Sequence, residues 1–89
     1  MHELSLFADL MRKIEAVATA QGATRVLRVS VTLGALSHLS PPHFREHFAQ
    51  LSPGSVAEGA ELEIDVLTDP ADPHAQEILL RSVELELPE

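Results

Sequence analysis

Hydrophobic residues recur at steps of three and four in the first part of the chain, and this spacing predicts an amphipathic helix of about five turns. Most polar residues of the segment fall on the opposite side. Gln21 and Gly22 should end the helix, with Gly22 as a left-handed cap. We assign the apolar stripe to the hydrophobic core, and it comprises Leu4, Phe7, Leu10, Met11, Ile14, Val17 and Ala18.

A second helix is predicted to begin at Ser40-Pro41-Pro42, because a serine cap followed by proline at the first helical position is a common start. Phe44, Phe48 and Leu51 follow at steps of four and three, so they should form its buried stripe. Residues 52–54 (Ser-Pro-Gly) should end it.

Three segments alternate between apolar and polar residues, which predicts strands at 25–33, 61–66 and 78–87. In the first strand, one face should carry Leu27, Val29, Val31 and Leu33, and the other Val26, Arg28, Ser30 and Thr32. The alternation slips near residues 79–81, where we expect a bulge. A loop rich in Asp and Pro, residues 68–73, separates the last two strands.

The order helix-strand-helix-strand-strand predicts an α+β fold, with two helices packed on one face of a small three-stranded sheet. The outer, solvated face should carry Arg28 among the carboxylates of Glu61, Glu63, Asp65, Glu84 and Glu86. Strand order stays open. If the first two strands are neighbours, a right-handed crossover through the second helix makes them parallel.

The composition argues against several classes of function. A chain of 89 residues is expected to form one domain, 1–89. The net charge of −8 argues against binding to nucleic acid or to an anionic membrane surface. The absence of cysteine excludes disulfides and thiol nucleophiles, and no apolar run approaches the length of a membrane helix. We expect a cytoplasmic protein.

Candidate chemistry lies at the start, in Met1, His2 and Glu3. The terminal amine and the backbone and imidazole nitrogens of His2 can chelate one metal ion in a nearly planar set. Such a set suits Ni(II) or Cu(II) and not tetrahedral Zn(II). The bulky His2 should block removal of Met1, which the site requires.

The remaining histidines carry less information. His43 and His47 are four residues apart on one helix face, the spacing of metal ligands on a helix. Because no third ligand is evident, we interpret them as an exposed or partly packed helix side. His38 and His74 are candidates only for adventitious copper or nickel binding.

An enzyme is not expected. No nucleophile is placed beside a base, no glycine-rich phosphate loop follows a strand, and the carboxylates alternate along solvent faces instead of converging.

Four stretches, in the same order, resemble the HypA/HybF family of nickel-incorporation proteins. They are the start Met-His-Glu-Leu-Ser-Leu, residues 25–37 with their Gly-Ala-Leu-Ser turn, residues 57–64 (Ala-Glu-Gly-Ala-Glu-Leu-Glu-Ile), and residues 78–86. Together they cover most of the chain apart from residues 68–77.

The resemblance implies a metallochaperone that delivers Ni(II) during maturation of [NiFe]-hydrogenase, and in some organisms of urease. It implies nickel ligands on Met1, His2 and Glu3: the amine of residue 1, the side chain and backbone of His2, and the backbone of Glu3. It also implies two partners, a HypB-type GTPase and the precursor of the hydrogenase large subunit.

One departure from the family is large. The family has a zinc-binding segment with two Cys-x-x-Cys pairs between the second and third strands. Here residues 68–77 take that place without a cysteine, so we expect no zinc. The alternative function is a metal-independent adaptor of the maturation machinery. The edges of a three-stranded sheet could then pair with a partner segment or with a second copy in a homodimer.

Overall fold

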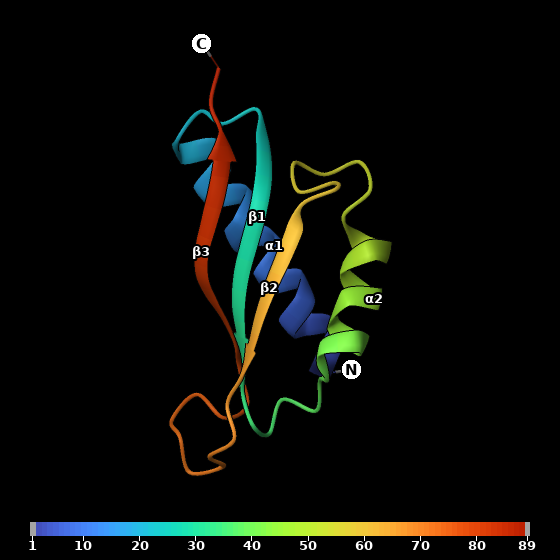
Figure 1. Ribbon diagram of the computed structural model, residues 1–89, viewed down its shortest axis with the longest axis vertical. Coiled ribbons are helices and arrows are strands. Elements are labelled where there is room, and N and C mark those ends of the chain that lie inside the picture. Colours follow the sequence, from blue (N-terminus) through green and yellow to red (C-terminus); the bar gives the residue numbers. More distant parts are fainter. Residues whose placement is uncertain (1, 89) are drawn as a thin grey trace.

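The computed structural model describes the backbone of residues 2–88 and the side chains of residues 5–88. Its elements follow the predicted order: α1 (His2–Ala20), β1 (Arg25–Leu33), α2 (Pro41–Leu51), β2 (Glu61–Val66) and β3 (Ile78–Glu86). Figure 1 shows α1 running diagonally behind the sheet and α2 lying on the β2 side. The predicted α+β class, two helices with a three-stranded sheet, is confirmed.

The sheet has the order β2-β1-β3, so β1 is its central strand. β1 is parallel to β2 and antiparallel to β3. We predicted that the first two strands would be parallel if they were neighbours. They are neighbours, and the connection through α2 makes them parallel, so the prediction is confirmed. The central position explains why β1 carries four fully or almost fully buried apolar residues: Val26, Val29, Val31 and Leu33.

Two bulges interrupt the pairing of β1 with β3. Ser30 pairs with Ser82 and Val31 with Leu80, which leaves Arg81 as an extra residue in β3. This is the bulge predicted from the slip in alternation. A second irregularity lies between Val26 and Arg28, whose partners in β3 are consecutive residues.

The predicted inner and outer faces were wrong at the start of β1, because the second bulge lies there. Val26 is fully buried, whereas Leu27 is only partly buried. The prediction placed Leu27 with Val29 in the core and Val26 on the outer face. An extra residue at Leu27 shifts the alternation by one position, so Val26 turns inward and Arg28 still points outward.

All five elements contribute to one hydrophobic cluster, which includes Phe7, Leu10, Ile14 and Ala18 of α1 and the buried Phe44 and Phe48 of α2. Two predictions for the stripes were wrong. Val17 and Leu51 are 37% and 43% exposed. Val17 follows Ile14 by three positions but lies toward the edge of the stripe, and Leu51 is the last residue of its helix. Leu4 lies outside the described side chains. No helix in the described part of the chain is long and apolar enough to cross a membrane.

The helix ends form as the sequence predicts. Gly22 adopts φ 66°, and the N–H groups of Gly22 and Ala23 donate to the carbonyls of Thr19 and Ala18 at 3.1 and 2.9 Å. This pair of hydrogen bonds is a Schellman cap. At the start of α2, the Ser40 hydroxyl accepts a hydrogen bond from the His43 N–H at 3.3 Å, and Pro41 occupies the first helical position.

Candidate metal centre

The predicted nickel ligands lie at the start of α1. Met1 is outside the described residues, and His2 and Glu3 are the first two residues of the helix, with side chains that are not described. The first four N–H groups of a helix have no acceptor within it. The helix therefore does not need the backbone nitrogens of His2 and Glu3 for its own hydrogen bonds.

Phe7 joins this end of α1 to the start of α2. Its side chain is fully buried, and its ring centroid lies 4.8 Å from that of Phe44 and 5.2 Å from that of His47. The first turns of the two helices consequently lie against each other, as Figure 1 also shows. α2 thus places its own side chains beside the first turns of α1.

His43 and His47 form a pair on α2 beside Phe7. Their Nε2 atoms are 2.8 Å apart, and both residues are half-buried. The prediction of a partly packed helix side is confirmed, but the four-residue spacing gave no sign that the two ring nitrogens face each other. His47 also stacks on Phe7, a neighbour that the sequence could not place there.

The other described histidines lie apart from this pair. His38 is exposed, with φ 62°, in the connection before α2, and His74 contacts the Glu77 carboxylate within the loop before β3. Among the described side chains, no group of three or more His, Cys, Asp or Glu residues could hold a metal ion. The two metal candidates are therefore the start of α1 and the histidine pair.

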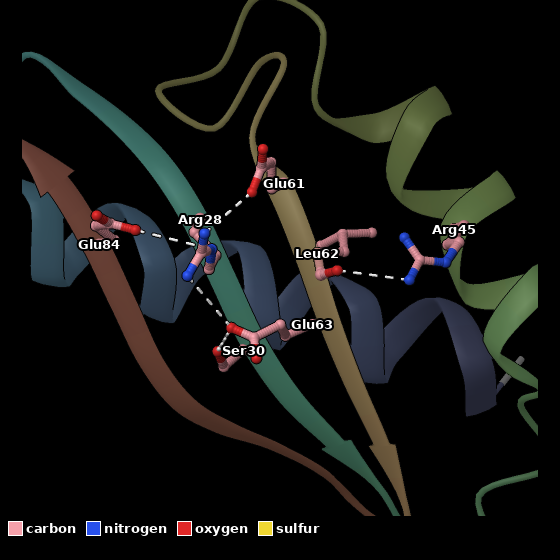
Figure 2. Close-up of polar contacts among 7 residues, drawn as sticks. All are labelled: Arg28, Ser30, Arg45, Glu61, Leu62, Glu63 and Glu84. Atoms are coloured by element: carbon pink, nitrogen blue, oxygen red, sulfur yellow. Dashed lines mark hydrogen bonds and ion pairs between the residues drawn. The ribbon is translucent and has the colours of Figure 1, made fainter.

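Three carboxylates of the outer sheet face are paired with Arg28, as Figure 2 shows. The Arg28 guanidinium lies 3.2 Å from Glu61, 3.6 Å from Glu63 and 3.8 Å from Glu84. The hydrogen bond to Glu61, together with the nearby negative charges, raises the pKa of Arg28 above its usual value. These groups are between 45% and 74% exposed. The predicted solvated face is confirmed.

The loop before β3 packs on the turn that follows β1. The Gly34 N–H donates to the Glu77 carbonyl at 2.8 Å, and the Leu36 N–H donates to the Ala75 carbonyl at 2.6 Å. A Cβ at position 34 would collide with the backbone of Ala75. Thr32, predicted on the open outer face, is only 5% exposed, and it lines the same hollow as loop residues Asp72 and His74. The short loop is therefore a packed part of the fold.

Residues 1–71 match the family described as "Hydrogenase/urease nickel incorporation, metallochaperone, hypA". Hydrogenase maturation factor HypA of Methanosarcina mazei is 37% identical over 67 residues, which cover 75% of this chain and 49% of that protein. The factor of the same name from Acidithiobacillus ferrooxidans is 41% identical over 64 residues, 72% of this chain and 57% of its own length.

The chain thus spans about half the length of the curated relatives that it matches. A solution structure of the Ni metallochaperone HypA from Helicobacter pylori superimposes with a TM-score of 0.78. The superposition covers 99% of this chain and all of that chain, at 20% sequence identity. At this identity the likeness concerns the fold, and the sequence matches carry the family assignment.

Proposed function

Because the chain belongs to the HypA family of hydrogenase and urease nickel-incorporation metallochaperones, we propose that it binds Ni(II) and delivers it during maturation of a [NiFe]-hydrogenase or another nickel enzyme. The observation that carries this proposal is the family match over residues 1–71, which includes Met1, His2 and Glu3. In this proposal the metal ion is cargo, and the chain is a carrier and not an enzyme.

The proposed ligands are the amine of Met1, the backbone and imidazole nitrogens of His2, and the backbone nitrogen of Glu3. A planar set of nitrogens suits Ni(II). The positive end of the helix dipole opposes a bound cation by about 0.3–1 kcal/mol. Backbone nitrogens that lose their protons on binding carry negative charge and offset this repulsion. The position of His2 and Glu3 at the first residues of α1 supports the set, because a helix leaves those N–H groups without an acceptor.

Delivery would proceed by docking and ligand exchange. We propose a HypB-type GTPase and the precursor of the hydrogenase large subunit as partners, since these are the partners that the family resemblance implies. A partner that hydrolyses GTP would place the chain in the cytoplasm. With a net charge of −8, docking to nucleic acid or to an anionic membrane is not proposed.

We further propose that the fold needs no zinc. These 89 residues contain no cysteine, so a four-cysteine zinc module between β2 and β3 cannot form. The hydrogen bonds of Gly34 and Leu36 to the loop before β3 support the proposal that the loop is held by backbone contacts instead.

The nickel site is tested by calorimetric titration of the untagged chain with Ni(II), beside the variant His2→Ala. We expect one tight site per chain in the native protein and its loss in the variant, because the substitution removes the imidazole nitrogen and the smaller side chain no longer blocks removal of Met1. His38→Ala is the matched control, since His38 is exposed and distant in the chain. Equal binding by the native chain and His2→Ala would contradict the assignment.

The second candidate function is the metal-independent adaptor, and one observation favours it. A hollow of about 600 Å³ lies between α2 and β2, lined by residues that include Arg45, Phe48 and Leu62. β2 is an edge strand, and the Arg45 guanidinium lies 3.5 Å from the Leu62 carbonyl oxygen. Binding of a partner that is indifferent both to nickel and to His2→Ala would favour the adaptor over the carrier.

A further inference from the structure

We propose that His43 and His47 form a second metal site, which takes a late divalent transition metal such as Ni(II) or Cu(II) through the two Nε2 atoms. The inference goes beyond the proposed carrier function, because it requires neither Met1 nor His2. It depends on three features of the described structure: the distance between the two nitrogens, the packing that holds the rings, and the place of the pair in the fold.

The distance between the nitrogens matches a particular coordination geometry. Imidazole nitrogens lie about 2.0–2.1 Å from a bound metal. Two such ligands at right angles, as neighbouring positions in a square-planar or octahedral complex, are about 2.8–3.0 Å apart. The observed distance between the Nε2 atoms of His43 and His47 is 2.8 Å. Imidazole nitrogen is a good ligand for Ni(II) and Cu(II), and both metals accept ligands in such neighbouring positions.

The His47 ring is packed against Phe7 before any metal binds, and the His43 ring lies against it, with centroids 4.5 Å apart. His47 stacks on the fully buried Phe7, with centroids 5.2 Å apart and planes inclined by 29°. His43 is the third residue of α2, and its backbone N–H is bound by the Ser40 cap. Without metal, the Nε2–H of one ring can donate to the Nε2 of the other. Metal binding through both Nε2 atoms requires each neutral ring to carry its single proton on Nδ1. The ring that donated therefore changes tautomer, and neither ring loses a proton.

The site would be open on the side away from the core. Both residues are half-buried, and no third His, Asp or Glu completes a closed group among the described residues. Water or a ligand from another molecule would fill the remaining positions. An open pair of this kind binds more weakly than the proposed chelate at Met1 and His2, and it exchanges its metal more readily. The pair lies on the part of α2 that packs against Phe7 of α1.

The pair is tested in the His2→Ala background, where the proposed primary site is removed. Ni(II) and Cu(II) salts are titrated into the full chain by calorimetry, and Cu(II) electron paramagnetic resonance counts the coordinated nitrogens. We expect one weaker site per chain that retains two imidazole nitrogens. Adding His43→Gln and His47→Gln should abolish it. The matched control adds His38→Gln and His74→Gln, which removes the same number of imidazoles and should leave the site intact.

A single variant separates loss of the metal ligand from loss of the folded structure. His47→Gln could disturb Phe7, so His43→Gln is also tested alone, with thermal unfolding as a check on the fold. It should weaken metal binding by about tenfold or more, because even the loss of a hydrogen-bonding partner of a ligand costs about that much. If the folded His43→Gln chain binds as tightly as its parent, or the control removes the site instead, the inference is overturned.

The outcomes for the two sites are distinguishable. Loss of all binding in His2→Ala would overturn the second site and leave the proposed carrier function standing. Retention of native affinity in His2→Ala, with loss on removing His43 and His47, would establish the histidine pair and contradict the nickel site at the amino terminus.

Discussion

Single residues in this protein matter for different physical reasons, and its glycines show this most clearly. Gly22, Gly54 and Gly59 have positive φ and nothing within 4 Å of the position of a Cβ. They are needed for their backbone conformation. Gly34 has no such φ, and a Cβ there would meet the carbonyl of Ala75. It is needed for space, because the loop before β3 lies directly on its backbone.

Gly34→Ala should therefore lower the free energy of unfolding by about 1–3 kcal/mol or more, the usual cost of forcing an extra methyl group into a packed site. Urea denaturation followed by circular dichroism measures it. Gly54→Ala is the matched control: it adds the same methyl group in open space, so only the cost of a left-handed backbone, about 1–2 kcal/mol, applies.

The two effects can be separated by what happens to the loop. Amide hydrogen exchange at Leu36 and Glu77 should become faster in Gly34→Ala and stay unchanged in Gly54→Ala, because only position 34 contacts the loop. Unchanged protection at Leu36 in a folded Gly34→Ala chain would show that the loop is not held by this turn.

At the scale of the element, helices and strands are joined by a few specific side chains. Phe7 joins α1 to α2, and Arg28 of β1 joins both neighbouring strands through Glu61, Glu63 and Glu84 (Figure 2). The first contact is buried and depends on packing. The second is exposed and depends on charge, so the two should respond differently to salt.

Arg28→Met keeps much of the aliphatic stem and removes the charge. We expect the free energy of unfolding to fall by about 0.5–1 kcal/mol, because exposed ion pairs contribute little each and three carboxylates lose their shared partner. Chemical denaturation at low salt measures this, and the difference should shrink at high salt. Arg25→Met is the control, since Arg25 begins the same strand without an ion pair to any described side chain. An equal effect of both substitutions would argue against the role of the Arg28 cluster.

Asp9 on α1 gives a prediction for pH. The hydrogen bond from Lys13, aided by the nearby charge of Arg12, holds the pKa of the Asp9 carboxyl below its usual value. Between the folded and the unfolded pKa, the unfolded chain binds more protons. The stabilising effect is therefore present above the usual pKa and is lost as the pH falls through the folded one.

The difference in melting temperature between the native chain and Asp9→Asn should be greatest near neutral pH. It should shrink as the pH falls below about 4, the usual range for an aspartate carboxyl. Lys13→Gln should give the same trend, because it removes the largest cause of the lowered pKa. A difference that does not change with pH would show that Asp9 acts through something other than its charge.

At the scale of the whole molecule, the chain matches the HypA family over residues 1–71. Only a short loop connects β2 to β3. The elements on both sides of that loop share one hydrophobic cluster with α1 and α2. The stability of the fold should then depend on apolar burial and backbone hydrogen bonds and not on a bound metal.

A chelator tests this directly. We expect EDTA to leave the melting temperature of the chain unchanged, whereas proteins with structural zinc unfold when the metal is removed. Metal analysis of the purified chain before and after dialysis against EDTA is the accompanying measurement. A fall in melting temperature that added zinc reverses would contradict the proposal.

Much of the fold followed from the sequence, whereas the nickel ligands at Met1, His2 and Glu3 stay a prediction. The caps at Gly22 and Ser40, the bulge near Arg81 and the order of the elements were predicted correctly, because each depends on residues within a turn or a strand of one another. The exposure of Val17 and Leu51 and the burial of Val26 were not predicted. Each depends on which neighbouring element covers the residue, and local periodicity does not contain that information.

The sequence alone determined the chemistry that is available: the candidate nickel ligands Met1, His2 and Glu3, the absence of cysteine, and the match to a nickel-incorporation family. Only the tertiary structure decided what lies beside what. Strand order, the fit of the loop against Gly34, and the 2.8 Å approach of His43 to His47 beside Phe7 result from packing between segments far apart in the chain. Such packing depends on how the apolar surfaces of all elements are buried together. No single stretch of sequence contains that information.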